Sequence, residues 1–392
     1  MNAEKVFLAL LRAEVCGEAV KQSVTDACTP EMLSAVYTLA NRHDLAHLVG
    51  QAASKLGLPE SEPLTKCKQA AMQAVYRYVQ LNYEYQQICK TLEEAEIPFI
   101  PLKGSVLRDY YPEPWMRTSC DIDVLVKEVD LNSAVKVLVE KLGYRSGGRG
   151  WHDVALSSSS GVHLELHFAT VEEGRARKSQ EVLQNIWNDA KPKAAETYHC
   201  CMSDEMFYFY HIAHMAKHLE NGGCGVRSFL DLWLLNHKLK DNRQKREVLL
   251  SRGELLQFAN AAEKLSEVWF SELDADTMCQ YFEKFVLGGG QFGNVENMVA
   301  ANRAKQSGEL AYILSRLFLP YSHMKRKYPI LNKHKWLTPF FQVIRWINLL
   351  FKGGVKRSVH ELQVNAAVSR EEEMSAGKLL EYLGLTDTTP LL

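Results

Sequence analysis

The stretch that decides the fold is residues 101–126, PLKGSVLRDYYPEPWMRTSCDIDVLV. It begins and ends with apolar residues typical of strands, but its last part carries two carboxylates, Asp121 and Asp123, inside an apolar run. Carboxylates are depleted in strands, and burying a charge without a partner is unfavourable. The two aspartates therefore need a partner.

The spacing of the two aspartates indicates what that partner is. In a strand, residues i and i+2 point to the same face, so Asp121 and Asp123 share one face while Ile122, Val124 and Val126 point to the core. Two neighbouring carboxylates repel each other. A divalent cation removes that repulsion, and Mg²⁺ favours carboxylate oxygens together with substrate phosphates.

A third carboxylate stands in the string VHLELHF, residues 162–168. Its apolar residues alternate with His163, Glu165 and His167, which share the opposite face of a strand. If this strand pairs beside the first, Glu165 joins the two aspartates. Three carboxylates on one sheet face can hold two metal ions about 4 Å apart, as in phosphoryl transfer. The two histidines then either orient the ligands or are exposed polar residues.

The string Lys103-Gly104-Ser105 follows an apolar run and precedes SVLRDYY, which we expect to be helical. Gly104 lets the backbone approach a ligand closely, and the Ser105 hydroxyl with a helix N-terminus favours a phosphate. Lys103 and Arg117 are expected to contact phosphate or the carboxylates. For Arg117, a structural ion pair is the alternative.

These motifs together resemble a known group of enzymes. The set GS…DID…LEL resembles the nucleotidyltransferase superfamily of the DNA polymerase β type. The longer string IPFIPLKGSVLRDYYPEPWMRTSCDIDVLV resembles one branch of it, an uncharacterised bacterial nucleotidyltransferase family with an LKG…YP…R…DIDLLV signature. HIAHMAKH, RSFLDLWLL and LFLPYSHMKRKYPIL are also similar to that branch, so the resemblance covers roughly residues 30–350.

The resemblance implies a chemistry. Gly104 and Ser105 would hold the triphosphate of a nucleotide such as ATP, and Asp121, Asp123 and Glu165 would bind Mg²⁺. An NMP group would then pass to a hydroxyl acceptor by two-metal catalysis. The third carboxylate here is glutamate, where aspartate is common in the superfamily. The resemblance does not identify the acceptor or the base.

A second group of polar residues, His211, His214, Lys217 and His218, has the spacing of roughly one helix face. Lys217 and His218 are expected to face the active cleft and touch the triphosphate. The alternatives are helix packing and a zinc site, although no HExxH pattern is present and a third ligand is unidentified.

The sequence predicts an α+β protein with a small mixed β-sheet nucleotidyltransferase core over residues 97–172. A helical segment, 1–96, precedes the core, and a helical region, 173–392, follows it. Within these, Thr29 and Asp130 are expected to be helix N-caps. Arg227 and Asp231, at positions i and i+4, are expected to form a salt bridge on one helix, and GGGQFGN (288–294) to be a loop between helices.

Residues 321–360 carry nine Lys and Arg residues and no Asp or Glu, around the apolar string WLTPFFQVIRWINLLF. Three interpretations stay open. The segment is a core helix with basic ends, or it contacts an anionic membrane surface, or it binds RNA or another polyanionic acceptor.

The composition excludes several classes of protein. The net charge of the 392-residue chain is -1, which gives no reason to expect a nucleic-acid or membrane partner for the whole molecule. No run reaches about 18 apolar residues, so no transmembrane segment is expected. Residues 1–15 read as an amphipathic helix rather than a signal peptide. The nine cysteines form no CxxC pair, which favours reduced thiols and a cytoplasmic location.

The predicted partner of DID is therefore Mg²⁺ with a nucleoside triphosphate, and the predicted function is Mg²⁺-dependent nucleotidyl transfer to an unidentified hydroxyl acceptor. Two alternatives belong to other classes. The first is a non-catalytic nucleotide-binding or regulatory protein that keeps the fold. The second is a metal-dependent hydrolase built on the helix that contains His211 and His218.

Overall fold

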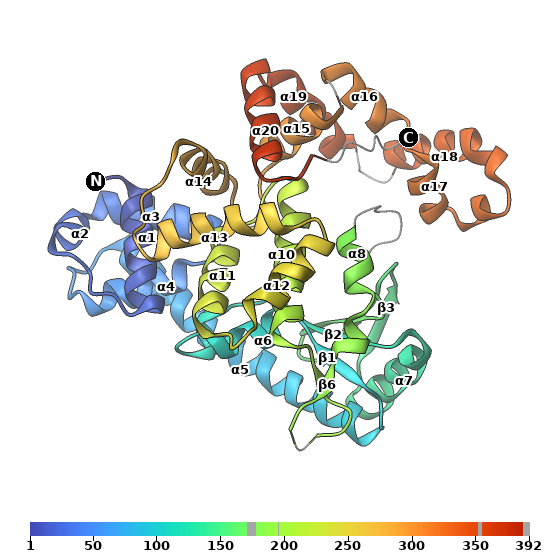
Figure 1. Cartoon of the computed structure of the whole chain (residues 1–392), viewed down its shortest axis with the longest axis horizontal. Coiled ribbons are helices and arrows are strands. Elements are labelled where there is room, and N and C mark those ends of the chain that lie inside the picture. The colour runs from blue at the N-terminus through green and yellow to red at the C-terminus, as the bar shows by residue number, and fades with distance from the viewer. Residues whose placement is uncertain (171–177, 195, 307, 352–354, 387–392) are drawn as a thin grey trace. The chain divides into compact units, whose positions relative to one another are not determined.

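The structure is a computed structural model that describes residues 1–170, 178–194, 196–306, 308–351 and 355–386 (Figure 1). The chain forms two compact units, Met1–His214 with Val226–Asp274, and Met215–Gly225 with Ala275–Leu392. The division of the sequence at 96 and 172 stays a prediction, and residue 172 itself lies outside the described residues.

The first unit contains a five-stranded mixed sheet, which confirms the predicted α+β class. Its strands are β1 (Phe99–Pro101), β2 (Asp121–Val126), β3 (Arg145–Arg149), β4 (Asp153–Ser157) and β5 (His163–His167). Their order across the sheet is β1-β2-β5-β4-β3. Only β2 and β5 pair in parallel; β1 with β2, β4 with β5 and β3 with β4 are antiparallel.

One face of this sheet forms a hydrophobic core cluster of the first unit. Ile122, Val124 and Val126 of β2 are buried there, as the alternation in the sequence predicts. Leu164 and Leu166 of β5 join them. Two helices, α5 (Glu62–Glu94) and α7 (Leu131–Leu142), cover this face with apolar side chains. The opposite face of β2 and β5 is consequently the one that carries polar groups.

The remaining helices of the first unit precede, interrupt and follow the strands along the chain (Figure 1). Before it come α1 (Ala3–Leu11), η1 (Arg12–Cys16), α2 (Gln22–Ala27), α3 (Pro30–Arg42) and α4 (Ala46–Lys55). Between β1 and α7 lie α6 (Gly104–Leu107), η2 (Arg108–Tyr110), η3 (Pro114–Met116) and η4 (Glu128–Asp130). After the sheet come α8 (Lys178–Leu183), α9 (Ile186–Asp189), α10 (Asp204–Glu220), α11 (Val226–Lys238), α12 (Arg243–Arg252) and α13 (Leu256–Phe270).

Several local expectations are confirmed and others are wrong. The Thr29 side chain caps α3, with Pro30 at its first position, as predicted. Asp130 stands at the N-cap of α7 but makes no capping bond with its side chain, because the 3₁₀ turn η4 leads directly into the helix. The helix expected after Ser105 is one turn only, α6, continued by η2.

The sequence analysis missed three strands. β3 has the sequence RSGGR and is exposed throughout, so it lacks the alternation that identifies a strand. A small ribbon pairs β6 (Lys191–Pro192) with β7 (Cys200–Cys201).

The N-terminal helix also differs from the expected amphipathic one, because every residue of Val6–Leu11 is buried.

The second unit is helical. It contains the C-terminal end of α10 and, after it, α14 (Thr277–Gly289), α15 (Val295–Gln306), α16 (Glu309–Leu317), α17 (Tyr321–Lys327), η5 (Pro329–Asn332), η6 (Lys335–Leu337), α18 (Thr338–Phe351), α19 (Val355–Ala367) and α20 (Arg370–Tyr382). The glycine-rich string at 288–294 connects α14 to α15, as predicted. Among the helices that the structure describes, none has both the length and the apolar character to cross a bilayer.

Candidate active site

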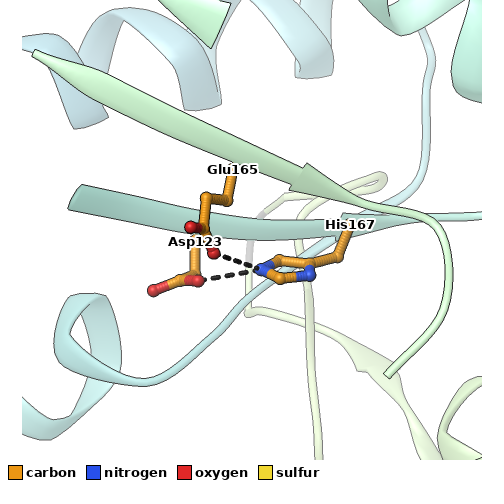
Figure 2. A group of neighbouring side chains, drawn as sticks. All are labelled: Asp123, Glu165 and His167. Carbon is orange, nitrogen blue, oxygen red and sulfur yellow. Dashed lines mark hydrogen bonds and ion pairs between the residues drawn. The ribbon is translucent and has the colours of Figure 1, made fainter. Parts of the chain in front are cut away.

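The parallel pairing of β2 with β5 brings the polar residues of the two strands together. Asp123 lies directly opposite Glu165, and Asp121 lies opposite His163. This pairing is the condition that the sequence analysis set for a three-carboxylate site. Figure 2 shows the result, in which the side chains of Asp123, Glu165 and His167 converge on one region beside the two strands.

The contacts in this cluster are short. His167 Nε2 donates to Asp123 Oδ1 at 2.8 Å and lies 3.4 Å from Glu165 Oε2 (Figure 2). Lys103 Nζ donates to the same Asp123 oxygen at 2.7 Å and lies 3.8 Å from Glu165 Oε2. Asp123 and His167 are buried, and Glu165 is partly exposed. Two basic groups thus compensate the carboxylates from within the protein.

These contacts change the acidity of the buried groups. Burial alone would raise the pKa of Asp123, but the hydrogen bond from His167 and the charge of Lys103 outweigh burial and hold that pKa below its ordinary value. The pKa of His167 is correspondingly raised, because the hydrogen bonds to Asp123 and Glu165 outweigh the opposing effect of burial. Asp123 is therefore ionised at neutral pH.

Asp121 has a different environment from Asp123. Their Cα atoms are two strand steps apart, about 6–7 Å, and Asp121 is not a member of the compact cluster. Burial raises the pKa of Asp121, and the charges of Asp123 and Glu165 add to that increase. Asp121 thus lies in the electrostatic field of the other two carboxylates.

The turn between β1 and α6 lies beside the cluster. Lys103 adopts φ +46°, which is unfavourable for a residue with a side chain, and this conformation accompanies its bond to Asp123. A Cβ atom on Gly104 would lie 3.0 Å from Ser119 Cβ, so only glycine fits without a shift. The Ser105 hydroxyl oxygen is buried and has no hydrogen-bond partner in the described part of the chain.

Arg117 lies in a buried network rather than beside the aspartates. Its Nε donates to Asp231 on α11 at 2.8 Å, and the Tyr111 hydroxyl donates to the same carboxylate at 2.8 Å. The expected pair between Arg227 and Asp231 is wrong, because Arg227 Nη1 binds Asp44 at 2.6 Å instead. Helical spacing permits such a pair, but tertiary contacts decide the partners here.

The same network fixes the loop that faces Gly104. Arg227 Nη1 lies 3.1 Å from the Thr118 hydroxyl, which donates to Asp44 at 2.9 Å. Arg108 Nη2 donates to the Ser119 hydroxyl at 3.2 Å, and its Nε donates to the carbonyl of Gly104 at 2.9 Å. Residues 117–119 are therefore held from two sides.

The expected residues of α10 divide between the two units. His211 belongs to the first unit and donates to the Ser228 carbonyl at 3.1 Å. Burial lowers the pKa of His211, so it is neutral. Lys217 and His218 belong to the second unit, and their contact with a triphosphate stays a prediction. Among the described residues, the group that could hold a metal ion is Asp123, Glu165 and His167, and it includes no histidine of α10.

The residue that the sequence analysis underweighted is His167. It stands two residues after Glu165 and shares its face, so the alternation of VHLELHF already contained the signal. The cluster offers two carboxylates and one imidazole, which suits a divalent metal. The one-turn α6 provides only a weak helix dipole, so a phosphate here would depend on Ser105, Lys103 and the backbone.

Comparison with protein families identifies the family of the chain. The model of a family described as "Uncharacterised nucleotidyltransferase" matches residues 30–271, which is more than half of the chain. A solved structure of the antibiotic-resistance factor ANT(2'')-Ia is similar at 16% sequence identity, with a TM-score of 0.33, over 45% of this chain and 91% of that one. That likeness is too distant to carry over a substrate. No curated protein matches the chain. By the family match, the chain belongs to the uncharacterised nucleotidyltransferase family, and its predicted enzyme class, nucleotidyltransferase, is confirmed.

Proposed function

We propose that the protein transfers the NMP group of a nucleoside triphosphate to a hydroxyl acceptor, with Mg²⁺ bound at the Asp123–Glu165 pair. The observation that carries this proposal is the position of those two carboxylates directly opposite each other on parallel strands, beside the turn at Gly104 and Ser105. Family membership supplies the reaction class.

The residues present fit a bound metal and triphosphate. Asp123 is held ionised, and Glu165 is partly exposed toward a ligand. The buried Ser105 hydroxyl has no partner in the described chain and would donate to a phosphate oxygen. The bound Mg²⁺ would neutralise charge on the phosphates and on the attacking oxygen. Asp123 and Glu165 would hold it, with Asp121 beside them as the third carboxylate.

The chain's own residues have separate roles in this proposal. Lys103, which contacts both carboxylates, would move its ammonium group to a phosphate oxygen when nucleotide binds. Asp121, with its raised pKa, would take the proton from the acceptor hydroxyl. The acceptor oxygen then forms its bond to the α-phosphorus, the bond from that phosphorus to the β-phosphate oxygen breaks, and pyrophosphate leaves.

The test is a labelling experiment with the intact protein. Nucleotides labelled at the α- or the γ-phosphate are incubated with Mg²⁺ and a panel of sugar, small-molecule, protein and RNA hydroxyl acceptors. The proposal predicts that one acceptor retains the α-label and that pyrophosphate appears in equal amount. Retention of the γ-label would instead identify phosphoryl transfer and contradict the proposal.

One observation favours the non-catalytic alternative. Lys103 and His167 already compensate Asp123 and Glu165 without any metal. In a protein that only binds nucleotide, this internal compensation would be permanent. Nucleotide binding that is independent of Mg²⁺, with no pyrophosphate released for any acceptor, is the result that identifies this alternative.

A further inference from the structure

The second unit carries an apolar surface that its own fold leaves uncovered. Helix α18 presents Trp336, just before its start, and Phe340, Val343 and Ile347 along it, with 76%, 61%, 46% and 48% of each residue exposed. Phe340, Val343 and Ile347 are spaced by three and four residues, so they lie on one side of α18. Trp336 lies in the 3₁₀ turn η6 that precedes it. We call this set the α18 stripe.

The opposite side of α18 buries two polar side chains, Gln342 and Arg345. Gln342 donates to the Leu319 carbonyl at 2.6 Å, and Arg345 donates to the Arg316 carbonyl at 3.1 Å. Both side chains are buried. The two most buried side chains described for α18 are therefore polar, whereas several of its large apolar side chains are exposed. The interpretation of 321–360 as an ordinary core helix is accordingly not supported for α18.

Helix α16 extends the same kind of surface. Leu310, Leu314 and Leu317 are exposed and also follow helical spacing. The indole of Trp346 donates to the Leu317 carbonyl at 2.9 Å and its ring contacts Phe318, which joins α18 to the end of α16. In Figure 1, α17 and α18 lie beside each other in the orange part of the chain.

The charged residues in the segment that contains the α18 stripe are all basic. Lys327, Lys333 and Lys335 are exposed in the segments that lead into α18, and residues 321–351 contain no Asp or Glu. Arg345 does not add to this surface because it is buried, and Lys352 lies outside the described residues. The surface thus combines exposed lysines with a tryptophan and large apolar side chains.

We propose that the α18 stripe and its flanking lysines bind the protein to an anionic lipid surface, with α18 lying in the interface. Apolar side chains on one helix face with basic residues beside them have the composition of interfacial helices, and tryptophan favours the membrane–water boundary. The lysines complement anionic headgroups. RNA would pair with the lysines but would leave Val343 and Ile347 in water, so the apolar face favours lipid.

The experiment is flotation of the full-length protein with vesicles of 30% phosphatidylglycerol in phosphatidylcholine, and with phosphatidylcholine alone. The proposal predicts flotation with the anionic vesicles and weaker flotation in 0.5 M salt. Phe340→Glu should reduce binding at least tenfold, and Lys333→Gln with Lys335→Gln should reduce it several-fold. Val248→Glu is the matched control, because Val248 is 57% exposed on α12, and it should bind like the wild type.

A second readout is tryptophan fluorescence. Vesicles should shift the emission of the wild type to shorter wavelength, and this shift should be lost in Trp336→Phe while flotation is retained. If Phe340→Glu fails to fold, Ile347→Gln serves in its place, because Ile347 is half exposed.

Four results would overturn the proposal. The first is no flotation with either vesicle, and the second is flotation that Phe340→Glu and Ile347→Gln leave unchanged. The third is binding to heparin that depends on the lysines but not on Phe340, which would identify a polyanion site. The fourth is a wild-type dimer in sedimentation velocity that Phe340→Glu dissociates, with no lipid binding, which would identify a second copy of the chain as the occupant.

Discussion

Lys103 Nζ and Asp123 Oδ1 form an ion pair of 2.7 Å at the centre of the candidate site, and Lys103 has a positive φ angle at that position. A non-glycine residue in such a conformation costs of order 1–3 kcal/mol and is found mostly at functional sites. The pair with Asp123 offsets that cost in the absence of ligand. Nucleotide binding would exchange the partner of Lys103 without changing the backbone.

Two substitutions of Lys103 distinguish the effect of its charge on nucleotide binding from the effect of its positive φ angle on stability. Lys103→Met should weaken nucleotide binding about tenfold, or about 1.4 kcal/mol, because a phosphate contact is lost. Lys103→Gly should weaken binding similarly but be more stable than Lys103→Met by about 1 kcal/mol, since glycine adopts positive φ readily. Calorimetry gives the affinity, and urea denaturation gives the stability. Unchanged nucleotide affinity in both variants would rule out the phosphate contact.

His167 and His163 lie on the same strand, β5, and differ in burial, so their substitutions can be compared directly. His167 is buried against Asp123, whereas His163 is exposed and hydrogen-bonds the Ser157 hydroxyl at 3.1 Å. His167→Ala should lower the free energy of unfolding by about 2 kcal/mol, because it removes a hydrogen bond to a buried charge. His163→Ala should change it by less than about 0.5 kcal/mol. Equal losses of unfolding free energy for the two variants in urea denaturation would show that the hydrogen bond from His167 to Asp123 does not stabilise the fold.

The two ion pairs of the Arg117–Arg227 network differ in burial. The Asp231 side chain is 1% exposed, whereas that of Asp44 is 42% exposed. Asp231→Asn should therefore destabilise the protein by about 3 kcal/mol, because it leaves a buried guanidinium without its charge partner. Asp44→Asn should cost about 0–1 kcal/mol. Thermal or urea unfolding measures both, and the opposite order would mean that the network is not arranged as described.

His211 gives the stability a dependence on pH. Its pKa in the folded state is lower than the ordinary 6.5, because burial opposes the charged form. Below pH 6.5 the unfolded chain therefore binds a proton that the folded chain does not, and the free energy of unfolding falls as the pH falls. His211→Gln should lose less stability than the wild type between pH 7.5 and 5.5. Identical losses in urea titrations at the two pH values would contradict this.

The sequence predicts which face of the sheet carries the site, because polar and apolar residues alternate over Asp121–Val124 of β2 and along β5. Their alternation fixes which residues share a face, and the observed register places Asp123 opposite Glu165. The alternation does not determine the register in which the two strands pair. It therefore could not show that Asp121 lies opposite His163 rather than Glu165, or that His167 completes the compact group.

Long-range partners are what the sequence could not supply. Arg227 and Asp231 have the spacing of a helical ion pair, but Asp44 and Arg117 approach them from other elements. Likewise, the sequence of residues 321–360 left a core helix open beside two surface interpretations, and only the structure shows that Gln342 and Arg345 are buried while Phe340, Val343 and Ile347 are exposed. In each case the residue types were visible and the packing decided their roles.

The most direct test of the central claim is calorimetric titration of each of the four nucleoside triphosphates, with and without Mg²⁺. The titrations compare the wild type with Asp121→Ala/Asp123→Ala, and His163→Ala is the control. The account predicts Mg²⁺-dependent binding of at least one nucleotide, retained in the control and lost in the double variant. Binding that the double variant retains in full, or no binding of any nucleotide to the wild type, would contradict it.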